Sequence, residues 1–275
     1  MKRVISLIAC VALLLFFGSM GSEAVAQEET PQNIIEELLD QETCGGCLEI
    51  TELFVEGGTP KTVLVLRRID QGTQKVRLQV VSSGAHEGYA YYSNIDAGAK
   101  DHIRDVMWVY PPRDGKVRRF NNILSGLLDT GIPPYFVDRA GWWKFYTWAL
   151  AGPQQLAGTP VPDYSFLPEV LVGWDQKEES RYVASVDLAA QGEIFLTARF
   201  SDPRRIDGKI RTAQAVIGPP NGPFTTAALR SIRFEQPDKE WLAQIFHRDR
   251  LSERRTPSDL QTRQGEILAK IDFLH

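Results

Sequence analysis

One short motif in the chain has the residue types of a catalytic site. Two leucines precede Asp129, Thr130 and a glycine, an order typical of aspartic proteases, in which paired aspartates share a proton and activate water. Retroviral-type enzymes also need an apolar-apolar-glycine loop beneath the aspartate, and Val216–Gly218 supplies a superficial match. Three-residue matches arise by chance, however, and such enzymes must dimerise to obtain their second aspartate. We therefore expect no enzymatic activity, with an aspartic-type hydrolase using Asp129 as a remote alternative.

Two cysteines, Cys44 and Cys47, have the Cys-x-x-Cys spacing of thioredoxin-like enzymes. In those enzymes the first cysteine begins a helix after a strand, where the helix dipole lowers its pKa. Here the pair is expected to follow a helix and precede a strand, which favours a structural disulfide between Cys44 and Cys47. Redox activity, metal binding and free thiols are the alternatives.

The sequence offers few further signs of catalysis or metal binding. None of the four histidines, at positions 86, 102, 247 and 275, has a partner at ligand spacing. No serine lies in a Gly-x-Ser-x-Gly elbow, and there is no glycine-rich phosphate loop. We therefore expect no bound metal and no cofactor.

The amino terminus has the pattern of a cleaved signal peptide. Basic residues at positions 2 and 3 precede an apolar run at 4–17, and small residues lead to Ala26, the expected cleavage site. A lipoprotein signal ending at Cys10 is the alternative. No later run reaches the about 20 apolar residues that span a bilayer, so an integral membrane protein is not expected. Residues 27–275 are predicted to act outside the cytoplasm, in the periplasm.

The charge of the mature chain is ordinary for a protein in solution. Cleavage removes two basic residues and one acidic residue, which changes the formal net charge from −4 to −5. This balance argues against a nucleic-acid partner.

The mature chain alternates β-rich runs and turns between two helices. Thr30 and Pro31 are typical of a helix start, and an apolar face predicts a helix up to about Gln41. A second amphipathic helix is expected at 257–275, after a single domain at 27–256. Because short turns join consecutive strands, the sequence predicts an antiparallel sheet. The expected strands are 62–69, 75–82, 107–110, 116–120, 181–188, 193–200, 209–217, 229–235 and 241–246.

Residues 121–173 form an insert that interrupts this alternation of strands and turns. The insert is rich in glycine and proline and contains the densest aromatic residues of the chain; we predict a helix at 141–150 and a loop from 151 onward. Loops seldom concentrate tryptophan unless they cover something apolar. We therefore expect the insert and nearby aromatic residues to line an apolar pocket. The candidate ligand-binding residues are Tyr91, Trp108, Tyr110, Tyr135, Phe136, Trp142, Trp143, Phe145, Tyr146 and Trp148.

Two segments resemble a known protein family. The stretch from Trp108 to Pro111, followed by Lys116–Arg119, is similar to the Trp-x-Tyr-x-Pro…Lys-x-Arg-Arg segment of bacterial outer-membrane lipoprotein-sorting proteins. Residues 246–251 resemble the carboxyl ends of that family. The resemblance spans about two-thirds of the mature chain. Residues 121–129 depart from the family's Ser-Phe-x-Gly-Ser-Asp-like stretch, so the cargo is not carried over.

The resemblance implies a fold shared with the periplasmic lipoprotein carrier LolA and the anti-sigma-factor regulator RseB. That fold is mainly β with flanking helices (α+β): a strongly curved antiparallel sheet forms an unclosed half-barrel that helices cover around an apolar cavity. The implied function is a periplasmic carrier of a lipid or of a lipoprotein acyl chain, with an inner-membrane transporter or an outer-membrane acceptor as protein partners. An envelope-stress sensor or protein-interaction module is the alternative.

The insert is the expected cover of this cavity. On that interpretation, alanine at Trp142 and Trp143 weakens acyl-chain binding and leaves the fold near that of the wild type.

Overall fold

The computed structural model describes residues 29–42, 46–70, 73–82, 87–96, 107–137, 139–236 and 238–252. The predicted signal peptide with Ala26, the alternative site at Cys10, Cys44 and the predicted helix at 257–275 lie outside the described residues.

Thirteen strands within the described residues form one antiparallel sheet. Their order in the sheet is β6-β5-β4-β3-β2-β1-β13-β12-β11-β10-β9-β8-β7, so the only neighbours far apart in sequence are β1 and β13. The strands are β1 (Leu48–Glu56), β2 (Lys61–Asp70), β3 (Thr73–Ser82), β4 (Ala90–Asp96), β5 (Met107–Tyr110), β6 (Arg118–Arg119), β7 (Tyr146–Gly152), β8 (Gln155–Pro160), β9 (Glu169–Lys177), β10 (Ser180–Ala190), β11 (Glu193–Ile206), β12 (Lys209–Gly218) and β13 (Thr225–Glu235).

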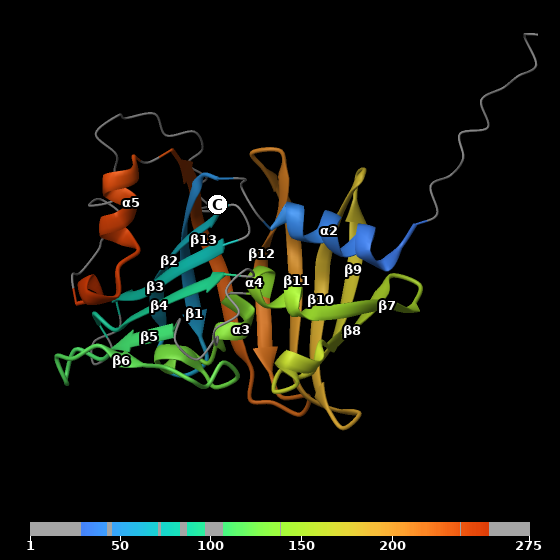
Figure 1. Ribbon diagram of the computed structural model, residues 1–275, viewed down its shortest axis with the longest axis horizontal. Helices are drawn as coiled ribbons and strands as arrows, with labels where there is room; N and C mark the ends of the chain where they lie inside the picture. Colours follow the sequence, from blue (N-terminus) through green and yellow to red (C-terminus); the bar gives the residue numbers. More distant parts are fainter. Residues whose placement is uncertain are drawn as a thin grey trace, which may run out of the picture.

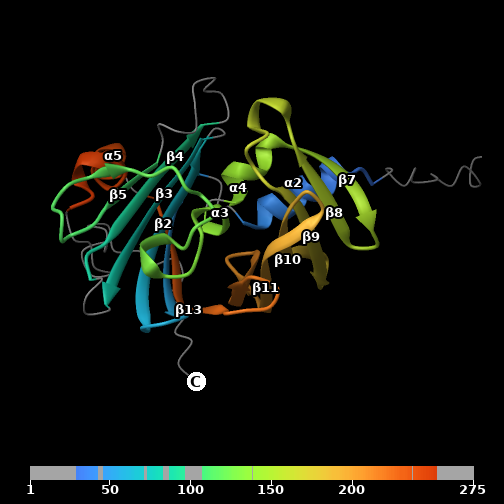
Figure 2. The same cartoon turned by 90° about the horizontal axis from the view of Figure 1, so that it is seen from below.

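The sheet is strongly curved and does not close on itself. Strands β6 and β7 stand at its two ends, and the two halves of the sheet face each other across the helical segments between them (Figures 1 and 2). This arrangement confirms the predicted half-barrel. The helical segments are α2 (Pro31–Gln41), η3 (Leu127–Asp129), α3 (Pro134–Val137), α4 (Arg139–Trp142), η4 (Trp143–Phe145), η5 (Pro162–Tyr164), α5 (Lys239–Ile245) and η6 (Arg248–Arg250).

The two faces of the first half of the sheet belong to different cores. In β2, Val63 and Val65 contact the main core on the inner face, whereas Leu64 and Leu66 pack with residues of α5 on the outer face. This alternation follows from the two-residue period of a strand. The inner core takes in the apolar face of α2 and the aromatic residues of the insert, so the concave side of the sheet is filled rather than empty.

Two predicted elements are wrong. Within the insert, residues 146–152, 155–160 and 169–173 lie in strands β7, β8 and β9, where the end of a helix and a loop were predicted. A tight turn at Gln154, whose φ is +62°, joins β7 to β8, so the glycine and proline residues there mark a hairpin rather than a loop. Residues 241–246, predicted as a strand, lie largely in α5, because Leu242, Ile245 and Phe246 share one helical face that packs on the outer core.

The start of α2 provides a test of the predicted cap. The Thr30 hydroxyl accepts a hydrogen bond of 3.2 Å from the Asn33 amide, and Pro31 occupies the first helical position. Thr30→Ala removes this acceptor and is expected to lower the free energy of unfolding by about 1 kcal/mol, as measured by urea denaturation followed by circular dichroism. Thr30→Ser keeps the hydroxyl and is the control; equal stability of the alanine and serine variants would contradict the role of the cap.

Candidate functional site

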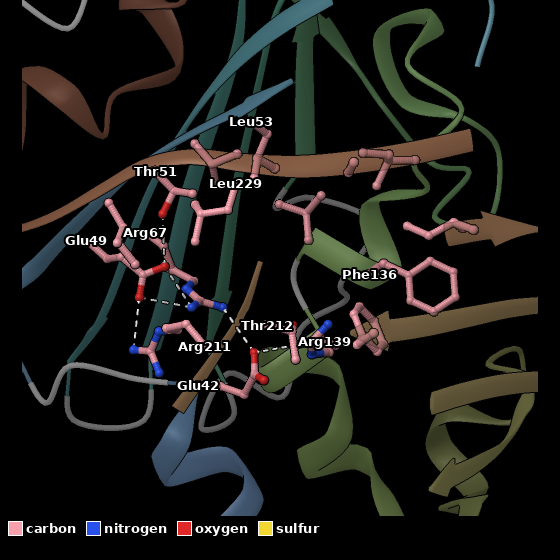
Figure 3. A pocket seen from close by; sticks show the side chains of 17 residues that line it. Glu42, Glu49, Thr51, Leu53, Arg67, Phe136, Arg139, Arg211, Thr212 and Leu229 are labelled. Carbon is pink, nitrogen blue, oxygen red and sulfur yellow. Dashed lines mark hydrogen bonds and ion pairs between the residues drawn. The ribbon is translucent and has the colours of Figure 1, made fainter. Parts of the chain in front are cut away.

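A cavity of about 160 Å³ lies between the inner face of the sheet and the segment that contains α3 and α4 (Figure 3). Strands β1, β2, β11, β12 and β13 supply its wall, and Ile132, Phe136, Val137 and Arg139 line it on the side of the insert. Most of the lining is apolar. The apolar residues are Leu53, Val65, Ile132, Phe136, Val137, Phe200, Ile217, Ala227, Leu229 and Ile232, and the polar ones are Glu42, Glu49, Thr51, Arg67, Arg139, Arg211 and Thr212.

The charged residues of the cavity form one network, which we call the arginine–glutamate cluster: Glu42, Glu49, Arg67, Arg139 and Arg211 (Figure 3). Glu49 Oε1 accepts from Arg67 Nη2 at 2.8 Å, and Glu49 Oε2 accepts from Arg211 Nη2 at 3.2 Å. Glu42 Oε2 lies 2.6 Å from Arg139 Nη2 and 3.8 Å from Arg67 Nη1. The cluster therefore ties the end of α2 and the start of α4 to β1, β2 and β12.

Both carboxylates of the cluster are held in their ionised form. Burial alone would raise the pKa of Glu42, but the charges of Arg139 and Arg67 outweigh it and leave this pKa below its ordinary value. Burial likewise opposes ionisation of Glu49, and Arg67 and Arg211 reverse the effect, so the pKa of Glu49 is also lowered. The cavity thus contains fixed charges of both signs in a site that is largely shielded from water.

Two arginines of the cluster are deeply buried and incompletely bonded. Arg139 is 8% exposed and Arg211 is 7% exposed, and the Nε atom of each is buried without a hydrogen-bond partner in the described part of the chain. The guanidinium of Arg139 also lies over the Phe200 ring, 4.5 Å from its centroid. Within the described residues, Arg139 therefore has an unsatisfied donor, Nε, and also contacts the apolar wall through Phe200.

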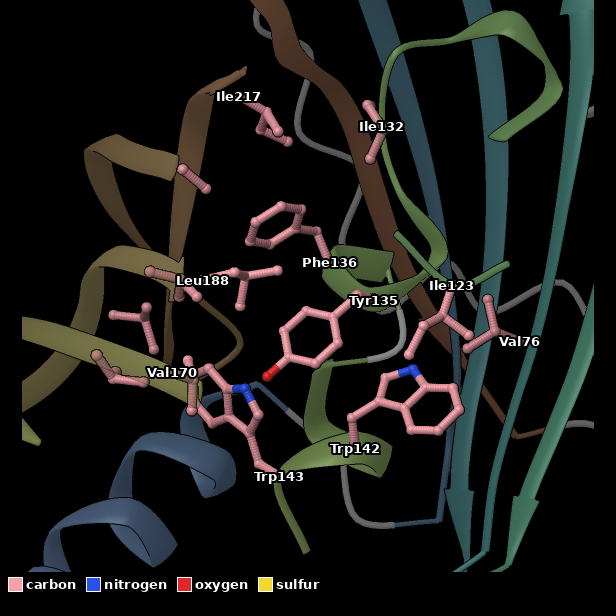
Figure 4. Close-up of a cluster of buried hydrophobic side chains, with 14 of the residues drawn as sticks. Val76, Ile123, Ile132, Tyr135, Phe136, Trp142, Trp143, Val170, Leu188 and Ile217 are labelled. Atoms are coloured by element: carbon pink, nitrogen blue, oxygen red, sulfur yellow. The ribbon is translucent and has the colours of Figure 1, made fainter. Parts of the chain in front are cut away.

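The aromatic residues of the insert form a packed plug beside the cavity (Figure 4). Trp142 and Trp143 are 0% and 1% exposed. The Tyr135 hydroxyl donates to the Tyr146 hydroxyl at 3.2 Å, which donates to the Pro168 carbonyl at 2.9 Å. Burial raises the pKa of Tyr135 well above its ordinary value, so this hydroxyl remains a neutral donor. In this conformation the aromatic plug is part of the hydrophobic core.

The structure divides the ten predicted ligand-binding residues between two places. Eight belong to the inner core or pack against it: Tyr91, Tyr135, Phe136, Trp142, Trp143, Phe145, Tyr146 and Trp148. Of these, Phe136 lines the cavity. Trp108 and Tyr110 lie on the opposite face, where Trp108 stacks on Tyr92 at a centroid distance of 5.5 Å, beneath the residues of α5. The predicted residues therefore do not form one continuous lining.

The two other candidate motifs have structural explanations. The segment that contains Asp129 forms a 3-10 turn in which the Thr130 hydroxyl donates to the Leu127 carbonyl and accepts from the Ile132 amide. Gly131 has a φ of +74°, and a Cβ atom there would lie 2.0 Å from the Thr225 hydroxyl, so close packing requires glycine. Cys47 is buried and disulfide-bonded; Cys44, its predicted partner, lies outside the described residues.

Sequence reasoning missed the arginine–glutamate cluster. The signal that would have located part of it is the alternation within strands: Arg67 follows Val63 and Val65 on the inward face of β2. Glu49 precedes Thr51 and Leu53 on β1 in the same way. A charged residue at a position whose neighbours two places away are buried indicates an internal polar site.

Comparison with solved structures shows the fold. The chain is similar to an outer membrane lipoprotein-sorting protein domain from Vibrio parahaemolyticus, with a TM-score of 0.63, 15% sequence identity, and coverage of 81% of this chain and 100% of that chain. A DUF1329 family protein from Desulfovibrio piger gives a TM-score of 0.64 at 15% identity and covers 80% and 98% of the two chains. The LolA superfamily protein NE2245 from Nitrosomonas europaea gives 0.60 at 16% identity and covers 80% and 99%.

These matches confirm the fold that the sequence resemblance implied. No family model matches the chain, and no curated protein matches it. Within the described residues, no helix combines the length and the hydropathy needed to cross a membrane.

Proposed function

We propose that this chain is an exported periplasmic carrier that binds the acyl chain of a lipid or lipoprotein between the curved sheet and the α3–α4 segment. The observation that carries the proposal is the cavity, whose wall is mostly apolar and which lies beside the aromatic plug. The lipoprotein-sorting description of one structure with this fold supports it. The activity is binding and transfer, without a chemical step.

The size of the cavity suggests how a bound chain would be released. Burying an acyl chain gains about 0.8 kcal/mol per CH₂, or on the order of 12 kcal/mol for sixteen carbons. The cavity of about 160 Å³ is smaller than the roughly 300–1,000 Å³ of ordinary ligand pockets. A long chain therefore has to displace part of the aromatic plug, and the free energy of that displacement offsets part of the gain. Reversible binding, which a carrier needs, follows from this balance.

The direct test is native mass spectrometry with lipid extraction. The chain would be exported by its own signal, purified from a periplasmic fraction without detergent and weighed under native conditions. We expect a stoichiometric lipid or lipoprotein adduct that extraction with organic solvent removes. A mass that shows the polypeptide alone would contradict the carrier proposal and favour a protein-interaction module on the same fold.

A matched pair of substitutions on β13 tests whether the cavity is the binding site. Ala227 lines the cavity, and its neighbour Ala228 projects to the other face of the strand. Ala227→Phe places a ring in the cavity and is expected to raise the Kd for the fluorescent fatty acid cis-parinarate at least tenfold, whereas Ala228→Phe leaves it within about twofold. Extra volume in a packed site costs about 1–3 kcal/mol, so both variants are first checked for folding by circular dichroism. Equal Kd values for the two folded variants would place the ligand elsewhere.

A further inference from the structure

The charged end of the cavity carries an excess of positive charge. Among the described residues that line it, three arginines stand against two glutamates. Both carboxylates already form ion pairs with arginines of the cluster. Counted over these five residues, the lining has a formal charge of +1, in a site where buried charge is costly unless it is paired.

Two arginines of the cluster, Arg139 and Arg211, have buried donor atoms without a hydrogen-bond partner among the described residues. Glu49 receives bonds from both Arg67 and Arg211, and Glu42 lies against Arg139 with Arg67 farther away. Arg139 and Arg211 each contact their carboxylate through Nη2, and the Nε atom of each is buried without a partner. A guanidinium offers donors only and no acceptor. A group that satisfies these atoms must therefore be an acceptor, and the positive formal charge of the lining favours an anion.

The same cavity also selects for an apolar group. Phe136 and Phe200 lie on the side of Arg139, and Leu53, Val65 and Ile217 extend the apolar wall on the strands. A free inorganic anion would satisfy the arginines and leave this wall unused. A ligand with an anionic head and an apolar chain fits both parts.

We propose that the arginine–glutamate cluster binds the anionic head group, a carboxylate or a phosphate, of an amphiphile whose chain lies along the apolar wall. This inference rests on the proposed carrier function and specifies its ligand class. Arg139 and Arg211 donate to the head group, and Arg67 holds both glutamates in place. The cluster thereby fixes the orientation of the ligand, with its head at the end of α2 and its chain along the apolar lining that includes Ile217 and Phe136.

Ligands that share one chain length separate the contributions of head and chain. The delipidated mature protein is titrated calorimetrically with dodecanoate, dodecyl phosphate, 1-dodecanol and inorganic phosphate. We expect dodecanoate or dodecyl phosphate to bind at least tenfold more tightly than dodecanol, and inorganic phosphate to bind at least a hundredfold more weakly than either. Equal affinity for dodecanol would overturn the head-group site and leave the carrier proposal intact. No binding of any amphiphile would overturn both, and tight binding of inorganic phosphate would show a free-anion site.

Substitutions of the surplus arginines test the assignment of the donors. In Arg211→Gln, Glu49 remains paired with Arg67, so the cluster loses its excess charge without leaving a carboxylate unpaired. The preference for dodecanoate over dodecanol should fall at least fivefold, with dodecanol affinity unchanged, and Arg211→Lys should restore part of it. Arg139→Gln is the second variant if Arg211→Gln fails to fold. Arg205→Gln removes an exposed arginine that is paired with Glu178 and should change nothing. An unchanged preference in a folded Arg211→Gln or Arg139→Gln protein would refute the proposal.

Discussion

Trp142→Ala is expected to lower the free energy of unfolding by about 3–5 kcal/mol. The indole of Trp142 is completely buried and packs edge-on against Phe145, with ring centroids 6.4 Å apart. Alanine removes this apolar contact and leaves a hole that the surrounding sheet and helices fill only partly. This burial argues against the sequence-based expectation that alanine at 142 and 143 leaves the fold near that of the wild type, and the same argument applies to the buried Trp143.

Urea denaturation followed by circular dichroism measures this loss directly. The matched control is Phe166→Ala, because Phe166 is a large aromatic residue of the same segment that is 58% exposed. Its replacement should change the free energy of unfolding by less than about 1 kcal/mol. If both variants unfold at the same urea concentration, the insert is not part of the core.

A destabilised Trp142→Ala protein would also bear on the movement of the cover. The same contacts that stabilise the fold must be broken in part when a long chain enters, because the cavity alone is too small for it. Tight packing of the aromatic plug thus makes the binding of a long acyl chain less favourable. The cover predicted from the sequence is at once a part of the core and the element that would have to move.

Local patterns in the sequence predicted the hairpins well. The strands at 62–69 and 75–82 pair as β2 and β3, and those at 193–200 and 209–217 pair as β11 and β12. In each case a turn-forming glycine lies between two runs rich in β-branched residues. The signals that predict the hairpin therefore lie within about twenty residues of one another. The cap at Thr30 is another such local signal, and the structure confirms it.

The strands of the insert were not predicted because their sequences lack those signals. Strand β8, Gln155–Pro160, contains glycine and proline and has few β-branched residues. It forms because β7 and β9 pair with it on both sides, with Leu156 opposite both Leu150 and Val172. Tertiary pairing here overrides weak local propensity.

The arginine–glutamate cluster was beyond a local reading for a different reason. Glu49 and Arg211 are 162 positions apart, and Glu49 and Arg67 are 18 apart. Their meeting depends on β1 pairing with β13 at the centre of the sheet, a contact that no turn signal specifies. The inward position of a charged residue on its strand identifies single members of the cluster, but only the pairing of β1 with β13 and of β13 with β12 brings them together.

Glu49→Gln is expected to lower the free energy of unfolding at pH 7 by about 3–5 kcal/mol, because it leaves the buried Arg211 without its carboxylate partner and weakens the hold on Arg67. The pKa of Glu49 is lowered in the folded protein. Its ionisation therefore stabilises the fold above the unfolded-state pKa of about 4.3, and this contribution is lost as the pH falls through the lower folded-state value. The difference between wild type and variant should consequently shrink in acid.

Urea denaturation at a series of pH values from 7 to 3 tests both parts of this expectation. Glu178→Gln is the control, because Glu178 forms an ion pair with Arg205 at the surface, where its side chain is 60% exposed. Such a pair contributes at most about 1 kcal/mol. A loss in Glu49→Gln no larger than that of the control would show that the cluster is solvated in solution. A loss that stays constant down to pH 3 would instead show that a missing hydrogen bond, and not the buried charge, destabilises the variant.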